Sequence, residues 1–408
     1  MSNNELNALG IFIFGGSATF GAEAAGFKVD KVLELTDTMH LESAYHFAKN
    51  RPDIPLVLPK EWENHQYLQD LNAKDYDLIY ANCPCSGLSQ INKSASVDSS
   101  TNIHFYRLFD SFKEIKPKVF MIENAPRLIT MGYPIIKDML DKLQSDYKFT
   151  ILRDYAGSHG VAMKRMRTMV VGWRRDVFDN KIPLIHMAKQ KQMTIKEAIG
   201  DLYNVPLGSL PNHDFHPDRS WKEFEHLYDQ VPGQSSILLT AVSKWDEWSQ
   251  FFNKEDHNTY IKQIEQAIEK KKDGKNIWDK SPWRTGENNA APSLTSVTEL
   301  IHPIHSRPFT IREYARLMGF PDDFVFYTEE TNTDIIQALA QGVPAPFVKY
   351  ITGEISEALN GNRALINNDQ GLVNFQHHTK GLHKTYTYDE MKLMTGLDVD
   401  KSFDKLEQ

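Results

Sequence analysis

The chain has 408 residues, which exceeds one typical domain and predicts two lobes or one large domain with an insertion. Apolar residues make up 41% and charged residues 25%, a balance typical of globular proteins that argues against global disorder. The formal net charge of −8 gives no overall nucleic-acid signature, although nucleic-acid binding requires a basic cleft rather than a basic total.

The sequence favours a cytoplasmic protein without membrane association. No apolar run approaches the ~18 residues that a membrane span needs. The apolar stretch Leu9–Phe14 is too short for a signal peptide, and no basic cluster precedes it. The two cysteines, Cys83 and Cys85, are too close for an ordinary structural disulfide, which fits a reducing compartment. We also expect a monomer.

The first half of the chain alternates short apolar strands with helices. The predicted elements are strands at Leu9–Phe14, Val32–Leu35, Leu56–Leu58, Leu78–Ala81, Val119–Ile122 and Met169–Gly172, with helices at Ala22–Gly26 and Ser43–Asn50. This alternation is typical of βαβ units. It predicts an α/β fold with a mainly parallel sheet that binds ligands at the carboxyl ends of its strands.

The pattern changes after about residue 186. Tryptophans concentrate in residues 201–290, the same range contains the basic cluster Lys270–Lys272, and the strand–helix alternation stops. We therefore predict a catalytic domain at 1–186, a second lobe at 187–299, a return to the first domain at 300–361 and a peripheral tail at 362–408. Helices are expected at Ile311–Gly319 and Asp334–Leu359, and Thr387–Glu390 has capping-box spacing for one more.

Three short strings could carry chemistry. Cys85 follows the strand Leu78–Ala81 in a Pro/Gly/Ser turn, Glu123 ends the strand at 119–122, and Arg165 and Arg167 precede the strand at 169–172. Taken alone, a cysteine is more often a buried small hydrophobic residue, the glutamate a cap or ion-pair partner, and the arginines a solvated edge or a phosphate contact. No second Cys/His pair has ligand spacing, so no metal site is expected.

In this order, the strings resemble the cytosine-C5 DNA methyltransferase family. Pro84-Cys85, Glu123-Asn124 and Arg165-x-Arg167 are followed by a long insertion and then by Arg307–Pro321, where the family reads Arg-x-Leu-Thr-x-Arg-Glu-x-Ala-Arg-Leu-x-Gly-Phe-Pro. The resemblance covers about residues 9–360. It implies the Rossmann-like fold of class I S-adenosylmethionine-dependent methyltransferases, with a smaller target-recognition lobe in the insertion.

The resemblance also implies the chemistry. Cys85 would add to C6 of cytosine, because a thiolate is both a good nucleophile and a good leaving group. Glu123 would protonate N3, and Arg167 would contact O2. Arg165 would contact a phosphate or the thiolate side of the pocket. The partner would be double-stranded DNA with the target base flipped out.

S-adenosylmethionine is the cofactor that the resemblance implies. Its candidate contacts are Phe14, Gly15, Gly16, Ser17, Thr19, Glu34, Pro84, Gln341 and Val343. Glycines let a backbone approach a ligand closely, and an acidic residue that ends the second strand can hold ribose hydroxyls. The chain departs from the family at several positions: a shortened glycine loop, no clear aspartate after the third strand, Cys83 for proline, Ser86 for glutamine, Ala125 for valine, Met163 for glutamine and Gln341 for asparagine.

Two alternatives remain open from the sequence. The first is a tRNA cytosine-C5 methyltransferase on the same scaffold, which the long second lobe disfavours. The second is a catalytically silent homologue that binds nucleic acid or a partner methyltransferase. The altered cofactor motifs favour this second alternative, and the intact Cys85 and Glu123 disfavour it.

Overall fold

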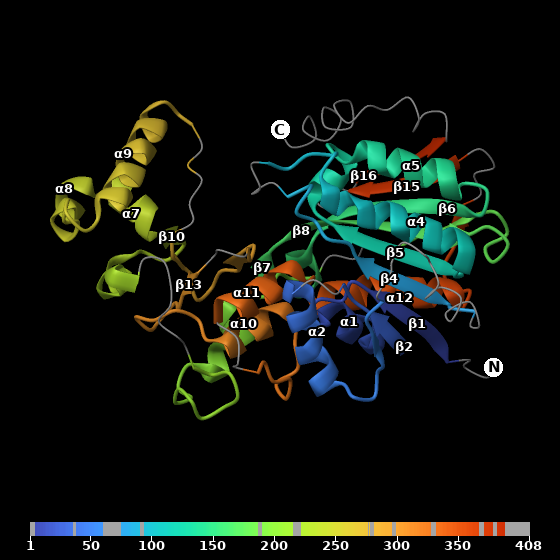
Figure 1. The fold of residues 1–408 in the computed structure, drawn as a ribbon, viewed down its shortest axis with the longest axis horizontal. Helices are drawn as coiled ribbons and strands as arrows, with labels where there is room; N and C mark the ends of the chain where they lie inside the picture. Colours follow the sequence, from blue (N-terminus) through green and yellow to red (C-terminus); the bar gives the residue numbers. More distant parts are fainter. Residues whose placement is uncertain are drawn as a thin grey trace.

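A mainly parallel sheet organises the part of the molecule at the right of Figure 1. The computed structural model describes residues 5–35, 38–59, 75–89, 94–186, 190–214, 222–275, 277, 281–295, 299–327, 332–366, 371–377 and 382–387. Within these residues the sheet has nine strands, in the order β16 (Leu382–Thr387), β15 (Gly371–His377), β6 (Tyr147–Tyr155), β8 (Met166–Arg174), β5 (Val119–Asn124), β4 (Leu78–Asn82), β1 (Leu6–Ile11), β2 (Phe27–Leu33) and β3 (Leu56–Val57). The predicted α/β class is confirmed.

The strand directions bring several chain segments to one edge of the sheet. β3, β2, β1, β4 and β5 are mutually parallel, so their carboxyl ends meet there. β8 is antiparallel to both β5 and β6, and its first residues therefore lie at the same edge. The turns after β1, β4 and β5 and the start of β8 consequently surround one region.

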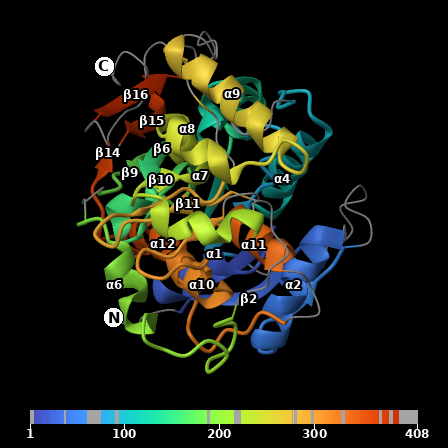
Figure 2. The ribbon, with the colours of Figure 1, turned by 90° about the vertical axis from the view of Figure 1, so that its left-hand side faces the viewer.

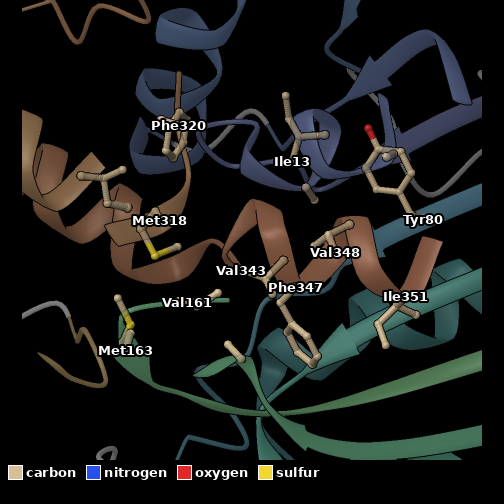
Figure 3. Close-up of a cluster of buried hydrophobic side chains, with 14 of the residues drawn as sticks. Ile13, Tyr80, Val161, Met163, Met318, Phe320, Val343, Phe347, Val348 and Ile351 are labelled. Carbon is tan, nitrogen blue, oxygen red and sulfur yellow. The ribbon is translucent and has the colours of Figure 1, made fainter. Parts of the chain in front are cut away.

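Helices cover both faces of this sheet. Within the described residues, the α-helices of the whole molecule are α1 (Ser17–Ala24), α2 (Thr38–Asn50), α4 (Ile103–Ile115), α5 (Tyr133–Leu143), α6 (Ile195–Ile199), α7 (Ile237–Ser243), α8 (Trp245–Trp248), α9 (Asn258–Lys272), α10 (Ile311–Met318), α11 (Asn332–Gln341) and α12 (Ala345–Leu359). Strand side chains alternate between faces: Leu78 and Tyr80 join the core beneath α1 and α12, whereas Ile79 and Ala81 join the core beneath α4 and α5. Figure 3 shows the first of these cores.

A third, separate core forms within the insertion. Phe224, Leu227, Trp248 and Ile264 are buried together beneath α7, α8 and α9. These helices lie apart from the sheet at the left of Figure 1, and Figure 2 views the molecule from their side. By contrast, Ile195 and Ile199 of α6 pack into the core beneath α12 and α10. The unit with its own core, which contains α7, α8 and α9, therefore comprises fewer residues than the predicted lobe at 187–299.

The remaining strands are short. They are β7 (Met163–Lys164), β9 (Ile182–Pro183), β10 (Ser235–Ser236), β11 (Trp283–Arg284), β12 (Ala291–Pro292), β13 (Leu300–Ile301) and β14 (Leu365–Ile366). β10, β11 and β13 form one small sheet, β12 pairs with β7, and β14 pairs with β9. The β7–β12 pairing joins the end of the insertion to the segment just before β8.

Several element boundaries differ from the predictions. β1 ends at Ile11 rather than Phe14, because Phe12 and Phe14 adopt left-handed backbone angles and belong to the turn. The helix expected at Asp334–Leu359 is two helices, α11 and α12, interrupted before Pro344, whose ring cannot continue a helix. The segment expected as a tail contributes β15 and β16 to the sheet, and Thr387 ends β16. The rest of the predicted capping box, residues 388–390, lies outside the described residues.

Candidate active site

Cys85 lies in a tight turn directly after β4. The Leu88 N–H donates to the Cys85 carbonyl at 2.9 Å, and the Asn124 amide donates to the Cys83 carbonyl at 2.9 Å. A side chain at Gly87 would meet Asn102 Oδ1 at 2.5 Å, so only glycine fits there. The turn is therefore held from β5 and from the 3₁₀ helix Ser100–Asn102. Cys83 is buried among apolar residues, whereas Cys85 is half-buried at the edge of the sheet.

Glu123 and Arg167 form a buried ion pair beside this turn. Glu123 is 4% exposed, and its Oε1 lies 2.7 Å from Nε of Arg167. Both belong to strands that reach the same edge, because Glu123 pairs with Met169 across β5 and β8 and Arg167 lies two residues before Met169 on the same face. The structure thus brings together two residues that are 44 positions apart in the chain.

The thiol and the carboxyl group influence each other's ionisation. Burial raises the pKa of Cys85, Glu123 raises it further, and Arg167 and Arg165 lower it. Burial likewise raises the pKa of Glu123, against the lowering effect of Arg167 and Arg165. Each group therefore ionises more easily when the other is neutral. Two guanidinium groups beside one thiol and one carboxyl group favour a site that holds a negative charge.

Arg165 has a different environment from the one expected. Its guanidinium is fully buried and donates to the carbonyls of Leu294 at 2.9 Å, Ala340 at 2.5 Å and Gly342 at 2.7 Å. Because this side chain is buried, its environment favours the thiolate side of the pocket over a phosphate contact. Its electrostatic effect on Cys85 remains. Arg165 joins the start of β8 to the turn between α11 and α12.

The turn between β1 and α1 fits the close approach of a ligand. Gly16 has φ +90°, and a Cβ atom there would meet the Phe47 ring at 2.1 Å. Glu34 follows β2, is fully buried, and accepts the Phe14 N–H at 2.6 Å and the Leu35 N–H at 2.7 Å. The carboxylate thus holds the turn in place, and a carboxylate is also an acceptor of the kind that hydroxyl groups bind. A glycine turn at a helix N-terminus beside a buried acid fits a nucleoside-containing cofactor.

Some of the other cofactor candidates lie beside the glycine turn, and others face the core. A Cβ atom at Gly342 would come within 2.8 Å of the Ser17 hydroxyl. The turn that contains Gln341 and Val343 therefore adjoins the glycine turn. Pro84 is buried in the Cys85 turn. Thr19 and Val343 face the core instead. The Thr19 hydroxyl is within 2.7 Å of the Tyr80 hydroxyl, and Val343 lies among apolar side chains in Figure 3.

Sequence reasoning missed one polar residue at this edge. Asn82 ends β4, is 1% exposed, and among the described residues neither its amide nitrogen nor its amide oxygen has a hydrogen-bond partner. The available signal was a polar side chain at the end of an apolar strand, directly before the cysteine turn.

The comparisons with known proteins decide the family. Residues 15–357 match the family described as C-5 cytosine-specific DNA methylase. The chain belongs to this family. It is therefore a methylase of cytosine C5 in DNA, of the S-adenosylmethionine-dependent class.

Curated relatives of the methylase agree with this assignment. It is 26% identical to the Type II methyltransferase M.PspPI of Psychrobacter sp. over 86% of this chain and 79% of the relative. It is 23% identical to the Type II methyltransferase M.NgoPII of Neisseria gonorrhoeae over 87% and 97%.

Solved structures share the fold. A prophage-encoded protein of E. coli, described as a DNA modification methyltransferase, has a TM-score of 0.60 at 21% identity, over 87% of this chain and 99% of that one. The methyltransferase EhMeth of Entamoeba histolytica has a TM-score of 0.53 at 13% identity, over 88% and 99%.

The late motif of the methylase is structural rather than chemical. Thr310 and Glu313 form a capping box that begins α10, and Arg307 pairs with Glu313 at 2.7 Å. Arg312 is buried and donates to the carbonyls of Pro211, Pro321 and Phe324. Through these buried hydrogen bonds the motif fixes α10 against the central core.

The described part of the methylase contains neither a metal centre of acidic, His and Cys side chains nor a membrane-spanning helix. Among these residues, no group of three His, Cys, Asp or Glu side chains is placed to hold a metal ion. In the same part of the chain, none of the helices is both long enough and apolar enough to cross a bilayer.

Proposed function

We propose that Cys85, Glu123 and Arg167 carry out the methylation chemistry of this protein. The observation that supports this proposal most strongly is their convergence: a half-buried thiol, a buried carboxyl group and a guanidinium from β4, β5 and β8 meet at one edge of the sheet. The ion pair of 2.7 Å holds the Glu123 carboxyl group beside Arg167, and both groups act electrostatically on the Cys85 thiol.

The proposed reaction begins with two coupled steps. The Cys85 thiolate forms a bond to C6 of cytosine, and the C5–C6 π electrons move onto C5 as Glu123 gives its proton to N3. When bound, S-adenosylmethionine supplies the methyl group that C5 accepts. A base then removes the C5 proton, the C6–S bond breaks to release the thiolate, and N3 returns its proton to Glu123.

The raised pKa values suit this sequence. Neutral Glu123 can donate a proton, and its neutrality favours the thiolate form of Cys85. Once the thiolate has added to C6 and Glu123 has delivered its proton, the negative charge moves from sulfur to the carboxylate, where Arg167 stabilises it. Arg165 contributes through its buried positive charge and positions the α11–α12 turn. General acid catalysis of this kind is typically worth ~10²–10⁴-fold in rate.

The remaining parts of the proposal concern the partners. The Phe14–Ser17 turn and Glu34 would hold S-adenosylmethionine, with Pro84 and Gln341 beside them. The unit formed by α7, α8 and α9 would recognise duplex DNA, because it has its own core and carries the exposed cluster Lys270–Lys272. A base within a duplex cannot reach Cys85, so the target cytosine would be flipped out. We propose that the enzyme acts as a monomer.

Substitution of each cysteine by alanine tests whether Cys85 is the nucleophile. Cys85→Ala should abolish methyl transfer, whereas the matched variant Cys83→Ala should lower it only modestly through lost packing of a buried side chain. Mass spectrometry of nucleosides from DNA incubated with each variant and the methyl donor reports base, position and amount together. An active Cys85→Ala with an inactive Cys83→Ala would overturn the assignment.

A further inference from the structure

The buried amide group of Asn82 destabilises the folded protein, because it lacks hydrogen bonds within the described residues. Its amide group is 1% exposed, and within the described part of the chain no atom pairs with its nitrogen or its oxygen. Burying an amide without hydrogen bonds destabilises the folded protein for each group left unsatisfied. An alanine or a serine would end β4 equally well, so stability of the fold alone does not explain this residue.

The sheet register defines where the amide points. Asn82 is the β4 partner of Glu123 in the parallel β4–β5 pair, so the two side chains leave the same face. Tyr80, two residues earlier on that face, contacts Thr19 of α1 through its hydroxyl. On the other side of β4, Ala81 pairs with Ile11, the last residue of β1, so Asn82 lies beside the start of the glycine turn. The amide thus lies between the glycine turn and Glu123.

The neighbours of this position favour one ligand chemistry. Glu123 is already paired with Arg167, and these two groups suit the cytosine edge. On the β1 side, α1 begins at Ser17 after Gly16, and a helix N-terminus attracts a carboxylate. An amide both donates and accepts hydrogen bonds. A group that carries an ammonium and a carboxylate on one carbon can use both functions of the amide.

We propose that Asn82 binds the amino-acid end of S-adenosylmethionine and so positions the methyl donor against Cys85 and Glu123. The amide oxygen accepts from the α-ammonium group, and the amide nitrogen donates to the carboxylate. This inference rests on the assignment of S-adenosylmethionine as the cofactor. Asn82 is a binding and positioning residue and takes no part in proton transfer.

Calorimetric titration with two product-like ligands tests the proposal. S-adenosylhomocysteine retains the ammonium and carboxylate groups, whereas 5′-methylthioadenosine lacks both. Asn82→Ala should raise the Kd of S-adenosylhomocysteine roughly 10- to 100-fold, as expected for the loss of hydrogen bonds to charged groups. The Kd of 5′-methylthioadenosine should stay unchanged. The Tm of the ligand-free protein should not fall, because the substitution removes two unsatisfied groups.

Asn212→Ala provides the matched control. Asn212 is also a buried asparagine, but its amide exchanges hydrogen bonds of 2.6 and 2.8 Å with the Phe326 backbone. This variant should lower the Tm of the ligand-free protein and leave both dissociation constants unchanged.

Three outcomes would overturn the proposal: equal weakening of both ligands by Asn82→Ala, unchanged binding of both, or a fall in Tm as large as that of Asn212→Ala with no selective loss. Wild-type protein that binds neither ligand would instead refute the cofactor assignment itself.

Discussion

Replacing Arg167 by methionine should destabilise the protein by an amount that grows with pH. The substitution removes the partner of Glu123, which is 4% exposed and lies 2.7 Å from the guanidinium. Breaking a buried ion pair from one side typically costs about 3–5 kcal/mol, and we expect about 3 because Arg165 still acts on Glu123.

The sign of the pH dependence follows from the pKa of Glu123. Burial raises this pKa and Arg167 lowers it, so the pKa rises further in Arg167→Met. Below the ordinary glutamate pKa of ~4.3, the carboxyl group is protonated in folded and unfolded chains, and the loss of Arg167 costs least. At higher pH the unfolded variant releases a proton that the folded variant retains. The free energy of unfolding of the variant therefore falls by up to ~1.4 kcal/mol per pH unit. Its difference from the wild-type free energy of unfolding widens once wild-type Glu123 ionises.

Urea unfolding at pH 5, 6, 7 and 8 measures this difference in free energy of unfolding between wild type and Arg167→Met. Lys116→Met is the matched control, because Lys116 forms an exposed ion pair of 2.8 Å with Asp146 that should contribute at most ~1 kcal/mol and show no widening. Adding Glu123→Gln to Arg167→Met should abolish the widening. A gap that is constant from pH 5 to pH 8, or no larger than that of Lys116→Met, would refute the reasoning.

Two further predictions concern the scaffold and the recognition unit. Arg165→Met should lower the free energy of unfolding in urea by more than ~3 kcal/mol, because three buried carbonyls lose their donor. Arg165→Lys should recover only part of this free energy, since one ammonium group cannot reach all three carbonyls. Full recovery would contradict a structural role for the three hydrogen bonds. Exchange of residues 187–299 for the equivalent segment of another family member should change the methylated sequence, read by methylation sequencing, and an unchanged preference would place recognition elsewhere. Replacing Lys270–Lys272 by glutamine should reduce the salt dependence of DNA binding by roughly 0.9 in slope per lost phosphate contact.

The sequence predicted the parallel half of the fold because its strands are nearly continuous apolar runs. β4 and β5 are buried along their whole lengths, and such runs between turn residues are recognisable without context. The position of the reactive strings at strand ends then placed Cys85 and Glu123 at one edge. β15 could not be predicted, because it pairs with β6 more than 200 residues earlier and Gly371–His377 mixes polar and apolar residues.

The environment of individual polar residues was less predictable. Arg165 and Arg167 are two positions apart and look equivalent in sequence, yet one is fully buried against backbone carbonyls and the other pairs with Glu123. The carbonyls that bind Arg165 come from segments more than 125 positions later. Asn82 shows the converse: it was visible as a polar residue that ends an apolar strand, but only its lack of partners among the described residues reveals the cost of burying it.

Covalent trapping on 5-fluorocytosine tests the central claim most directly. Attack by Cys85 at C6 and methylation at C5 give an adduct that is released only when the C5 proton leaves, and fluorine at C5 blocks that step. In the presence of S-adenosylmethionine, the wild-type protein should run on a denaturing gel as a shifted protein–DNA band. Cys85→Ala should give no band, and Glu123→Gln should form it ~10²–10⁴-fold more slowly because N3 protonation makes C6 electrophilic. Wild-type protein that binds both its DNA site and S-adenosylmethionine tightly yet never forms the band would contradict the mechanism.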